Sequence, residues 1–139
     1  MRGDRLLLGA ALLLPGCYAS NVVARTDRVV ADEAVPADWA PAAAGDLDGL
    51  FESVLVRGEA ALALRWVCYW FGRDGRYAGA ALVDGDDGMA FQTLNGRWTL
   101  TPRGLVLDAA EPAPLQAAGR HLRLVSATGE LVLRRSDLR

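Results

Sequence analysis

The chain is poor in the residues on which most catalytic and metal sites depend. Its 139 residues include one histidine, His121, and two cysteines, Cys17 and Cys68. A Ser/His/Asp relay needs a histidine beside its nucleophile, and a zinc site of the usual kind needs several histidine or cysteine ligands. We therefore expect no catalytic residues, no metal site and no cofactor, and we interpret the protein as non-enzymatic.

A concentration of positive charge is also missing. All 15 basic residues are arginine, none is lysine, and they are spread along a chain whose formal net charge is -2. Domains that bind nucleic acid usually carry a basic patch or stripe. The sequence therefore predicts that nucleic acid is not a partner.

One acidic stretch has two interpretations. Asp84, Asp86 and Asp87 are spaced like the start of a calcium-binding loop, but the later bidentate glutamate of such a loop is absent. We interpret the stretch as the solvated tip of a β-hairpin.

Long apolar runs are absent after residue 17, so no later segment is expected to span a bilayer as a helix. The start of the chain differs. Arg2 and Arg5 precede the apolar run Leu6 to Leu14, which is followed by a Pro-Gly break and small residues. A run of this length is too short for a permanent transmembrane helix, and its layout is typical of a secretory signal.

The end of this apolar run, LLLPGCYAS, carries a resemblance. Leu14-Pro15-Gly16-Cys17 resembles the lipobox of bacterial lipoproteins, in which an aliphatic residue stands three places before a cysteine and a small residue directly before it. The resemblance implies that residues 1–16 are removed and that the sulfur of Cys17 receives a diacylglyceryl group. An ordinary signal peptide cleaved after Ala19, or an uncleaved anchor, is the alternative. The resemblance to lipoproteins also implies a location. Since Tyr18 rather than aspartate follows the cysteine, the protein is expected to be acyl-anchored in the outer membrane, facing the periplasm.

From Tyr18 to about Asp46 the composition shifts toward alanine, proline and acidic residues. We interpret residues 17–47 as the lipidated cysteine and a tether that precedes a domain at 48–136. The alternative is a short segment that lies against the domain through its valines, which are Val22, Val23, Val29 and Val30.

Beyond Asp46, short alternating apolar runs are separated by turn signals, as is typical of an all-β meander. Eight strands are expected, at 50–56, 64–72, 76–83, 88–94, 96–101, 104–108, 120–126 and 130–135. The turns are expected at Asp74-Gly75, 84–88, Asn95-Gly96, 101–104 and 127–130. Asp74-Gly75 lies between aromatic runs and favours a primed two-residue turn, in which both central residues have positive φ.

The later strands have one apolar face. Its residues are Trp98, Leu100, Leu105, Leu107, Leu122, Leu124, Leu131 and Leu133, while Arg97, Thr99, Arg123 and Arg134 fall on the other face. Such a sheet avoids exposed edges most simply by closing on itself. With its opening DGLFES at 48–53, its hairpins and its closing GRWTL at 96–100, the domain resembles the small lipocalin-like barrels of bacterial envelope proteins. The expected fold is an antiparallel up-and-down meander that closes into a barrel of about eight strands.

An eight-stranded barrel is either filled by its own side chains or wide enough for one small ligand. The candidates for contact with such a ligand are Trp66, Trp70, Tyr77, Phe91 and Trp98. Short strands and bulky aromatics favour a filled interior, whereas the small residues 78–81 leave room for a cavity. Cys68 alternates with Trp66 and Trp70, and we interpret it as a small buried thiol.

Two functions of different classes follow. The first is a structural or protein-interaction module that presents a strand edge or loop to another envelope protein. The second is a carrier or sensor for a small apolar ligand inside the barrel. An exposed apolar patch favours the first, and an internal cavity of roughly a few hundred Å³ favours the second.

Overall fold

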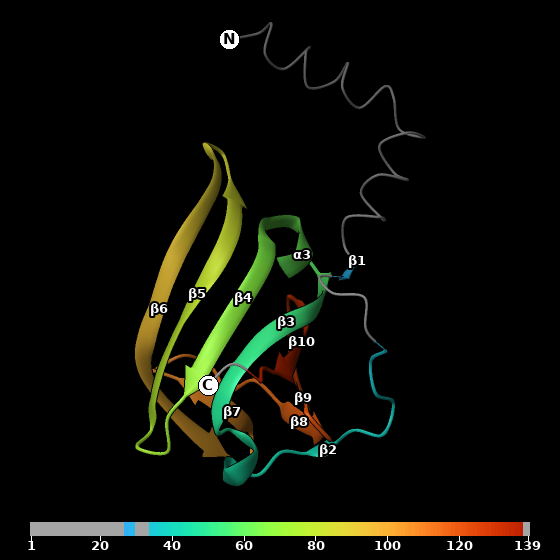
Figure 1. The fold of residues 1–139 in the computed structure, drawn as a ribbon, viewed down its shortest axis with the longest axis vertical. Helices are drawn as coiled ribbons and strands as arrows, with labels where there is room; N and C mark the ends of the chain where they lie inside the picture. Colours follow the sequence, from blue (N-terminus) through green and yellow to red (C-terminus); the bar gives the residue numbers. More distant parts are fainter. Residues whose placement is uncertain (1–26, 30–33, 138–139) are drawn as a thin grey trace, which may run out of the picture.

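The computed structural model describes residues 27–29 and 34–137. In these residues the chain forms ten β-strands, one short α-helix and one turn of 3-10 helix (Figure 1). The strands are β1 (Asp27–Val29), β2 (Ala40–Pro41), β3 (Gly49–Gly58), β4 (Leu64–Phe71), β5 (Arg76–Gly85), β6 (Gly88–Thr101), β7 (Gly104–Leu107), β8 (Leu115–Ala118), β9 (His121–Ser126) and β10 (Gly129–Arg135), and the helices are η1 (Ala44–Asp46) and α3 (Ala60–Ala63). The all-β class predicted from the sequence is confirmed.

The strands form one curled antiparallel sheet in the order β2-β8-β9-β10-β3-β4-β5-β6-β7, and β1 pairs with β3 outside this path. In Figure 1, β3 to β6 lie in front of β8 to β10. The end of the sheet at β7 returns to the segment before β8, where Leu105 and Ala113 exchange two backbone hydrogen bonds of 2.8 and 2.9 Å. This architecture agrees with the predicted up-and-down, lipocalin-like barrel.

The wall of the barrel has eight strands, β3 to β10, but one predicted turn within it is wrong. Asn95 and Gly96 do not form a turn, because β6 continues through them and pairs them with Ala78 and Tyr77 of β5. Gly96 is needed for another reason. A Cβ atom at this position would lie 2.2 Å from Oδ1 of Asp108.

The strand β8 is missing from the predicted set. It is four residues long and directly follows Pro114, and it pairs with β9 on one side and β2 on the other. Short strands next to proline carry little alternation, so the pattern of the sequence did not reveal it.

The other predicted turns are confirmed in position. Between β4 and β5 the loop has four residues rather than two, and of these only Gly75 has a positive φ, 83°. The amide of Gly72 donates to the carbonyl of Arg76 across this loop, at 2.8 Å. The expected primed two-residue turn is therefore wrong, although the hairpin is present.

Alternation along the strands builds a single apolar interior. Its buried members are Leu47, Phe51, Val67, Phe71, Tyr77, Ala81, Leu105, Leu115, Leu122 and Leu133. All eight apolar positions predicted to share a face in the later strands belong to this cluster or pack against it. The prediction of which side chains of the later strands face the interior is therefore confirmed.

Part of the predicted tether belongs to the folded domain. Leu47 is 1% exposed and lies in the barrel interior, and the amide of Ala42 donates to the carbonyl of Leu115 at 3.0 Å. Trp39 packs on the outside of the barrel against a second cluster formed by Val54, Leu55 and Val132. The expected domain boundary after residue 47 is therefore too late.

The segment before residue 48 contacts the barrel at further places. In β1, Val29 pairs with Leu55 of β3. Further on, the guanidinium carbon of Arg123 lies 5.1 Å from the centre of the Trp39 ring, a cation–π arrangement. Residues 34–47 then wrap around the lower part of the barrel (Figure 1).

This packing predicts the effect of a substitution outside the expected domain. Leu47→Ala is expected to lower the free energy of unfolding by about 2–5 kcal/mol, because it leaves a cavity in a buried core. The control is Leu62→Ala in α3, where the side chain is 48% exposed and the expected change is within about 0.5 kcal/mol. Urea unfolding of both variants measures the difference, and equal stability of the two would contradict this placement of residue 47.

Candidate functional site

The outward-facing side chains of β4, β5 and β6 form a mostly apolar surface. Directly opposed residues in these strands share a face of the sheet, and the residues that alternate with the buried Val67, Phe71 and Ala81 point outward. We call this surface the outer apolar face; its residues are Trp66, Cys68, Trp70, Ala78, Ala80, Leu82, Met89 and Phe91. Phe91 is 73% exposed, Met89 55% and Trp70 45%.

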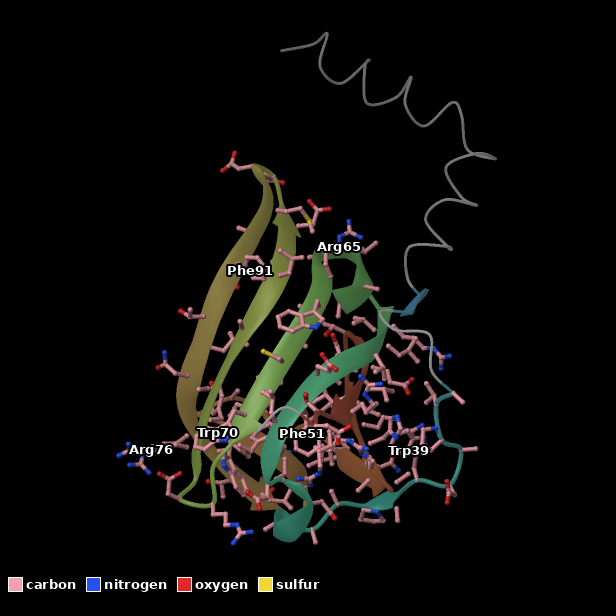
Figure 2. The ribbon with its side chains drawn as sticks, viewed as in Figure 1. Trp39, Phe51, Arg65, Trp70, Arg76 and Phe91 are labelled. Carbon is pink, nitrogen blue, oxygen red and sulfur yellow. The ribbon has the colours of Figure 1, made fainter. Side chains whose placement is uncertain are left out.

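Three of the five aromatic candidates for an internal ligand lie on this outer face. Trp66, Leu82 and Phe91 stand opposite one another across the three strands, and Trp70 stands opposite Ala78. In Figure 2, Trp70 lies near the lower end of the sheet and Phe91 higher up. The expectation that Trp66, Trp70 and Phe91 occupy the interior is therefore wrong. β4 carries bulky residues on both faces, so hydrophobicity alone does not show which face is buried.

The other two candidates lie inside. Tyr77 is buried, and Trp98 is half-buried against the core, with its indole Nε1 donating to the carbonyl of Gly72 at 2.9 Å. The Trp98 and Phe71 rings meet edge to face, with their centroids 6.2 Å apart. Cys68 was expected to be buried, but the structure places it half-buried on the outer apolar face.

The first half of β6 forms one edge of the sheet. β6 pairs with β5 from Gly88 to Arg97 without a register shift, but it pairs with β7 only from Trp98 to Thr101. On its other side, residues 88–96 have no partner strand in the described part of the chain. We call this stretch the open edge, and Figure 1 shows the hairpin that carries it extending beyond the other strands.

Arg97 fixes the direction of the backbone groups along the open edge. Its amide donates to Oδ1 of Asp108 at 3.0 Å, and its carbonyl accepts from the Asp108 amide at 2.7 Å, both on the side of β7. Groups alternate in direction along a strand. The N–H and C=O groups of Met89, Phe91, Thr93 and Asn95 therefore point out of the open edge.

Asp108 terminates the open edge through a compact set of hydrogen bonds. Its φ is 56°, and its Oδ2 accepts from the Tyr77 hydroxyl at 2.8 Å. The Arg97 amide and the Tyr77 hydroxyl lower the pKa of Asp108 below its ordinary value. Burial, together with the hydrogen bond and the charge of Asp108, raises the pKa of Tyr77 to about 12. Both pKa shifts favour an ionised Asp108 carboxylate beside a neutral Tyr77 phenol.

The opposite side of the barrel has a charged outer surface. Arg134 and Glu52 are 2.7 Å apart across β10 and β3, and Glu130 lies 3.7 Å from Arg57 and 3.8 Å from Arg123. The predicted outward direction of Arg123 and Arg134 agrees with these contacts. Charge therefore covers β3, β9 and β10, and apolar side chains cover β4 to β6.

The barrel also contains a cavity of about 250 Å³. Aliphatic side chains form most of its wall, among them Val56, Leu64, Leu105, Leu107, Leu124 and Leu131, and Glu111 and Glu130 also line it. None of the five aromatic candidates lines this cavity. The inward alternation of leucines is the signal of this cavity in the sequence, but the same pattern also predicts a filled core.

The acidic stretch forms the predicted hairpin tip. Gly85 and Gly88 pair at the end of the hairpin, with Asp86 and Asp87 as the turn between them. Asp84 forms an ion pair with Arg65 of β4. No cluster of three or more metal-ligating side chains occurs within residues 34–137.

The predicted lipobox lies outside the described residues, so Cys17 is not placed by the structure. Among the helices of the described part, none is both long and apolar enough to cross a membrane.

Comparison of the chain with protein-family models, with curated proteins and with solved structures gave no match. Function is therefore inferred from the outer apolar face, the open edge and the cavity.

The Tyr77–Asp108 contact predicts a pH effect. In Tyr77→Phe the pKa of Asp108 is expected to rise toward its ordinary value, because the carboxylate loses a donor. Since folding lowers this pKa, the contribution of Asp108 to stability is present above about pH 4 and is lost as the pH falls through the folded value. Carboxyl ¹³C titration by NMR measures the shift.

Tyr69→Phe is the control, because this half-buried tyrosine contacts the Tyr77 ring and has no hydrogen bond to Asp108. An unchanged Asp108 pKa in Tyr77→Phe, or an equal rise in Tyr69→Phe, would contradict this assignment.

Proposed function

We propose that the protein is a lipid-anchored, non-enzymatic module of the cell envelope that binds another protein chain through the outer apolar face and the open edge. The observation that carries this proposal is the exposure of Phe91, Met89 and Trp70 on one face of the sheet. Monomeric soluble domains rarely expose a large contiguous apolar surface, and where they do it commonly marks an interaction site.

The open edge supports the same conclusion through its backbone. Met89, Phe91, Thr93 and Asn95 direct N–H and C=O groups away from the sheet, and residues 88–93 are all exposed. An unpaired edge of this kind is a template on which an additional strand forms main-chain hydrogen bonds. The neighbouring apolar side chains supply the hydrophobic contact that makes such pairing stable.

The lipid anchor is proposed from the lipobox-like stretch. Each buried methylene of an acyl chain contributes about 0.8 kcal/mol, so one chain holds a protein marginally and two or three hold it stably. β1 begins at Asp27, and ten residue steps from Cys17 span at most about 35 Å. The anchor thus keeps the barrel close to the membrane surface, on the periplasmic side of an outer membrane.

The cavity supports a second candidate function, binding of a small apolar molecule. Its 250 Å³ exceed the space that one benzene-sized guest needs, since engineered apolar cavities of about 150 Å³ bind benzene. A protein with this role alone would need no partner on its outer apolar face. Crosslinking from that face therefore distinguishes the two candidates.

The first experiment introduces a photoreactive phenylalanine analogue in place of Phe91 in the full chain, in its own cells. Illumination is expected to give a covalent adduct with a protein, because a bound partner would cover this side chain. The matched control is the same analogue in place of Leu62, which is 48% exposed on α3. Absence of an adduct from position 91, or equal adducts from both positions, would reject the interaction module.

The second experiment tests the anchor. Cys17→Ser is expected to lose palmitate labelling and to leave the membrane fraction, because serine cannot form the thioether to the diacylglyceryl group. Cys68→Ser is the control, since this thiol lies in β4 of the folded domain, and it is expected to keep both properties. Equal labelling of wild type and Cys17→Ser would end the lipoprotein interpretation.

A further inference from the structure

Two arginines face each other on the outside of the barrel. Arg76 of β5 stands directly opposite Arg97 of β6, and both residues are exposed. Asp108 takes up the backbone groups of Arg97 on the side of β7, so Arg76 and Arg97 form a non-hydrogen-bonded pair. The Cα atoms of such a pair are about 4.5 Å apart, and like charges placed there are destabilising. The fold therefore keeps two guanidinium groups close together at a cost in stability.

Carboxylates compensate this positive charge only in part. The carboxylate of Asp74 lies 3.7 Å from Nε of Arg76, and both side chains are largely exposed to water. Asp108 accepts from the backbone amide of Arg97 and from the Tyr77 hydroxyl, not from the Arg97 side chain. Within the described residues, 27–29 and 34–137, the guanidinium of Arg97 has no ion-pair partner. This part of the surface therefore carries an excess of positive charge.

A hollow of about 350 Å³ lies beside the two arginines, and we call it the basic hollow. Besides Arg76 and Arg97 it is lined by Trp70, Ala78 and Asn95, which stand side by side across β4, β5 and β6. Ala78 is small and lies in the middle. Its two neighbours are separated by two strand spacings, roughly 10 Å. The basic hollow therefore has space above Ala78 for one planar ring.

The indole ring of Trp70 is turned toward the arginines. A Cβ atom on Gly72 would lie 2.6 Å from Cη2 of this ring, and the Gly72 amide donates to the Arg76 carbonyl at 2.8 Å. In Figure 2, Trp70 and Arg76 lie at the same end of the sheet. The ring is 45% exposed, so an aromatic surface is available beside the positive charge.

The two guanidinium groups favour a phosphoryl group over a carboxylate. One guanidinium fork already satisfies both oxygens of a carboxylate, whereas the three terminal oxygens of a phosphate ester accept hydrogen bonds from two forks. A phosphate ester carries a charge of about −1.5 to −2 at pH 7, which matches two arginines. The aromatic wall favours a ligand whose phosphoryl group is attached to a planar ring.

We propose that the basic hollow binds a small aromatic phosphate ester. Its phosphoryl group lies between Arg76 and Arg97, and its ring stacks against Trp70 above Ala78. Two residue steps along β5 separate Ala78 from Arg76, about 7 Å, so one small molecule reaches both positions. The proposal goes beyond the proposed function, since this site requires no protein partner.

The experiment is a titration of the full-length protein with phenyl phosphate at pH 7.5, followed by NMR. Saturable shifts are expected at the Nε–H groups of Arg76 and Arg97 and at Nε1–H of Trp70. Inorganic phosphate, which lacks the ring, is expected to bind about tenfold more weakly. Absence of saturable shifts at the two arginines, or equal affinity for both phosphates, would overturn the proposal.

Variants test the two parts of the site separately. Arg97→Gln is expected to weaken binding of phenyl phosphate about tenfold or more, because it removes charged hydrogen-bond donors. The matched control is Arg103→Gln, an exposed arginine in the turn between β6 and β7 and outside the basic hollow, which is expected to bind like wild type. Trp70→Leu is expected to bind phenyl phosphate no better than inorganic phosphate. Equal affinities of the two arginine variants, or an unchanged preference in Trp70→Leu, would overturn the proposal.

Thermal unfolding in phosphate-free buffer tests the repulsion between the arginines without a ligand. Arg97→Gln is expected to raise Tm by about 1–4 °C, because it removes a like-charge pair. Asp108 is held by the backbone of Arg97, so the substitution keeps that contact. Arg103→Gln is expected to leave Tm unchanged. A Tm of Arg97→Gln equal to or below that of wild type would overturn the repulsion from which the site is inferred.

Discussion

The structure depends on the point at which β6 changes its partner from β5 to β7. Asp108 sets this point, because it takes up both backbone groups of Arg97 and accepts the Tyr77 hydroxyl as well. Gly96 allows the carboxylate to approach, since any Cβ there would collide with it. With Asp108 turned away at a φ of 56°, the chain leaves the hairpin and returns to the barrel at Ala113. The open edge is what remains uncovered.

The outer surface of the barrel is divided in a way that follows from this arrangement. Ion pairs such as Glu52 with Arg134 cover β3 and β10, where the N-terminal segment also packs through Trp39. No described segment packs in the same way over β4 to β6, and there the outward positions carry Trp70, Met89 and Phe91. The charged side chains already have partners within the domain, whereas the apolar side chains on β4 to β6 are exposed to water. The apolar side is therefore the candidate for binding.

Alternation in the sequence was informative wherever one face of a strand is apolar and the other polar. In β9 and β10 it identified the inward leucines, because their neighbours Arg123 and Arg134 mark the outward face. It failed in β4, where aromatic residues occupy both faces, and Trp70 was therefore assigned to the wrong side. It also failed at Asn95-Gly96, since a glycine needed for the approach of a carboxylate looks the same in sequence as a glycine needed for a turn.

The candidate site could be anticipated only in part. The sequence predicts that a strand edge is presented to another protein, but it does not show which strand has the free edge. The position of the open edge depends on a contact between Arg97 and Asp108, which are eleven residues apart. No local pattern shows such a contact. Likewise, the packing of Leu47 and Trp39 on the barrel arises from a segment whose alanine and proline content is typical of a linker.

Amide hydrogen exchange, resolved by NMR in the full-length protein with and without the protein crosslinked from position 91, tests the central claim most directly. The amides of Phe91 and Thr93 point out of the sheet, whereas that of Gln92 is directed to β5. If another chain pairs with the open edge, exchange at Phe91 and Thr93 slows when that protein is present, while exchange at Gln92 changes much less. Exchange at Phe91 and Thr93 that stays fast in the presence of that protein would contradict the account.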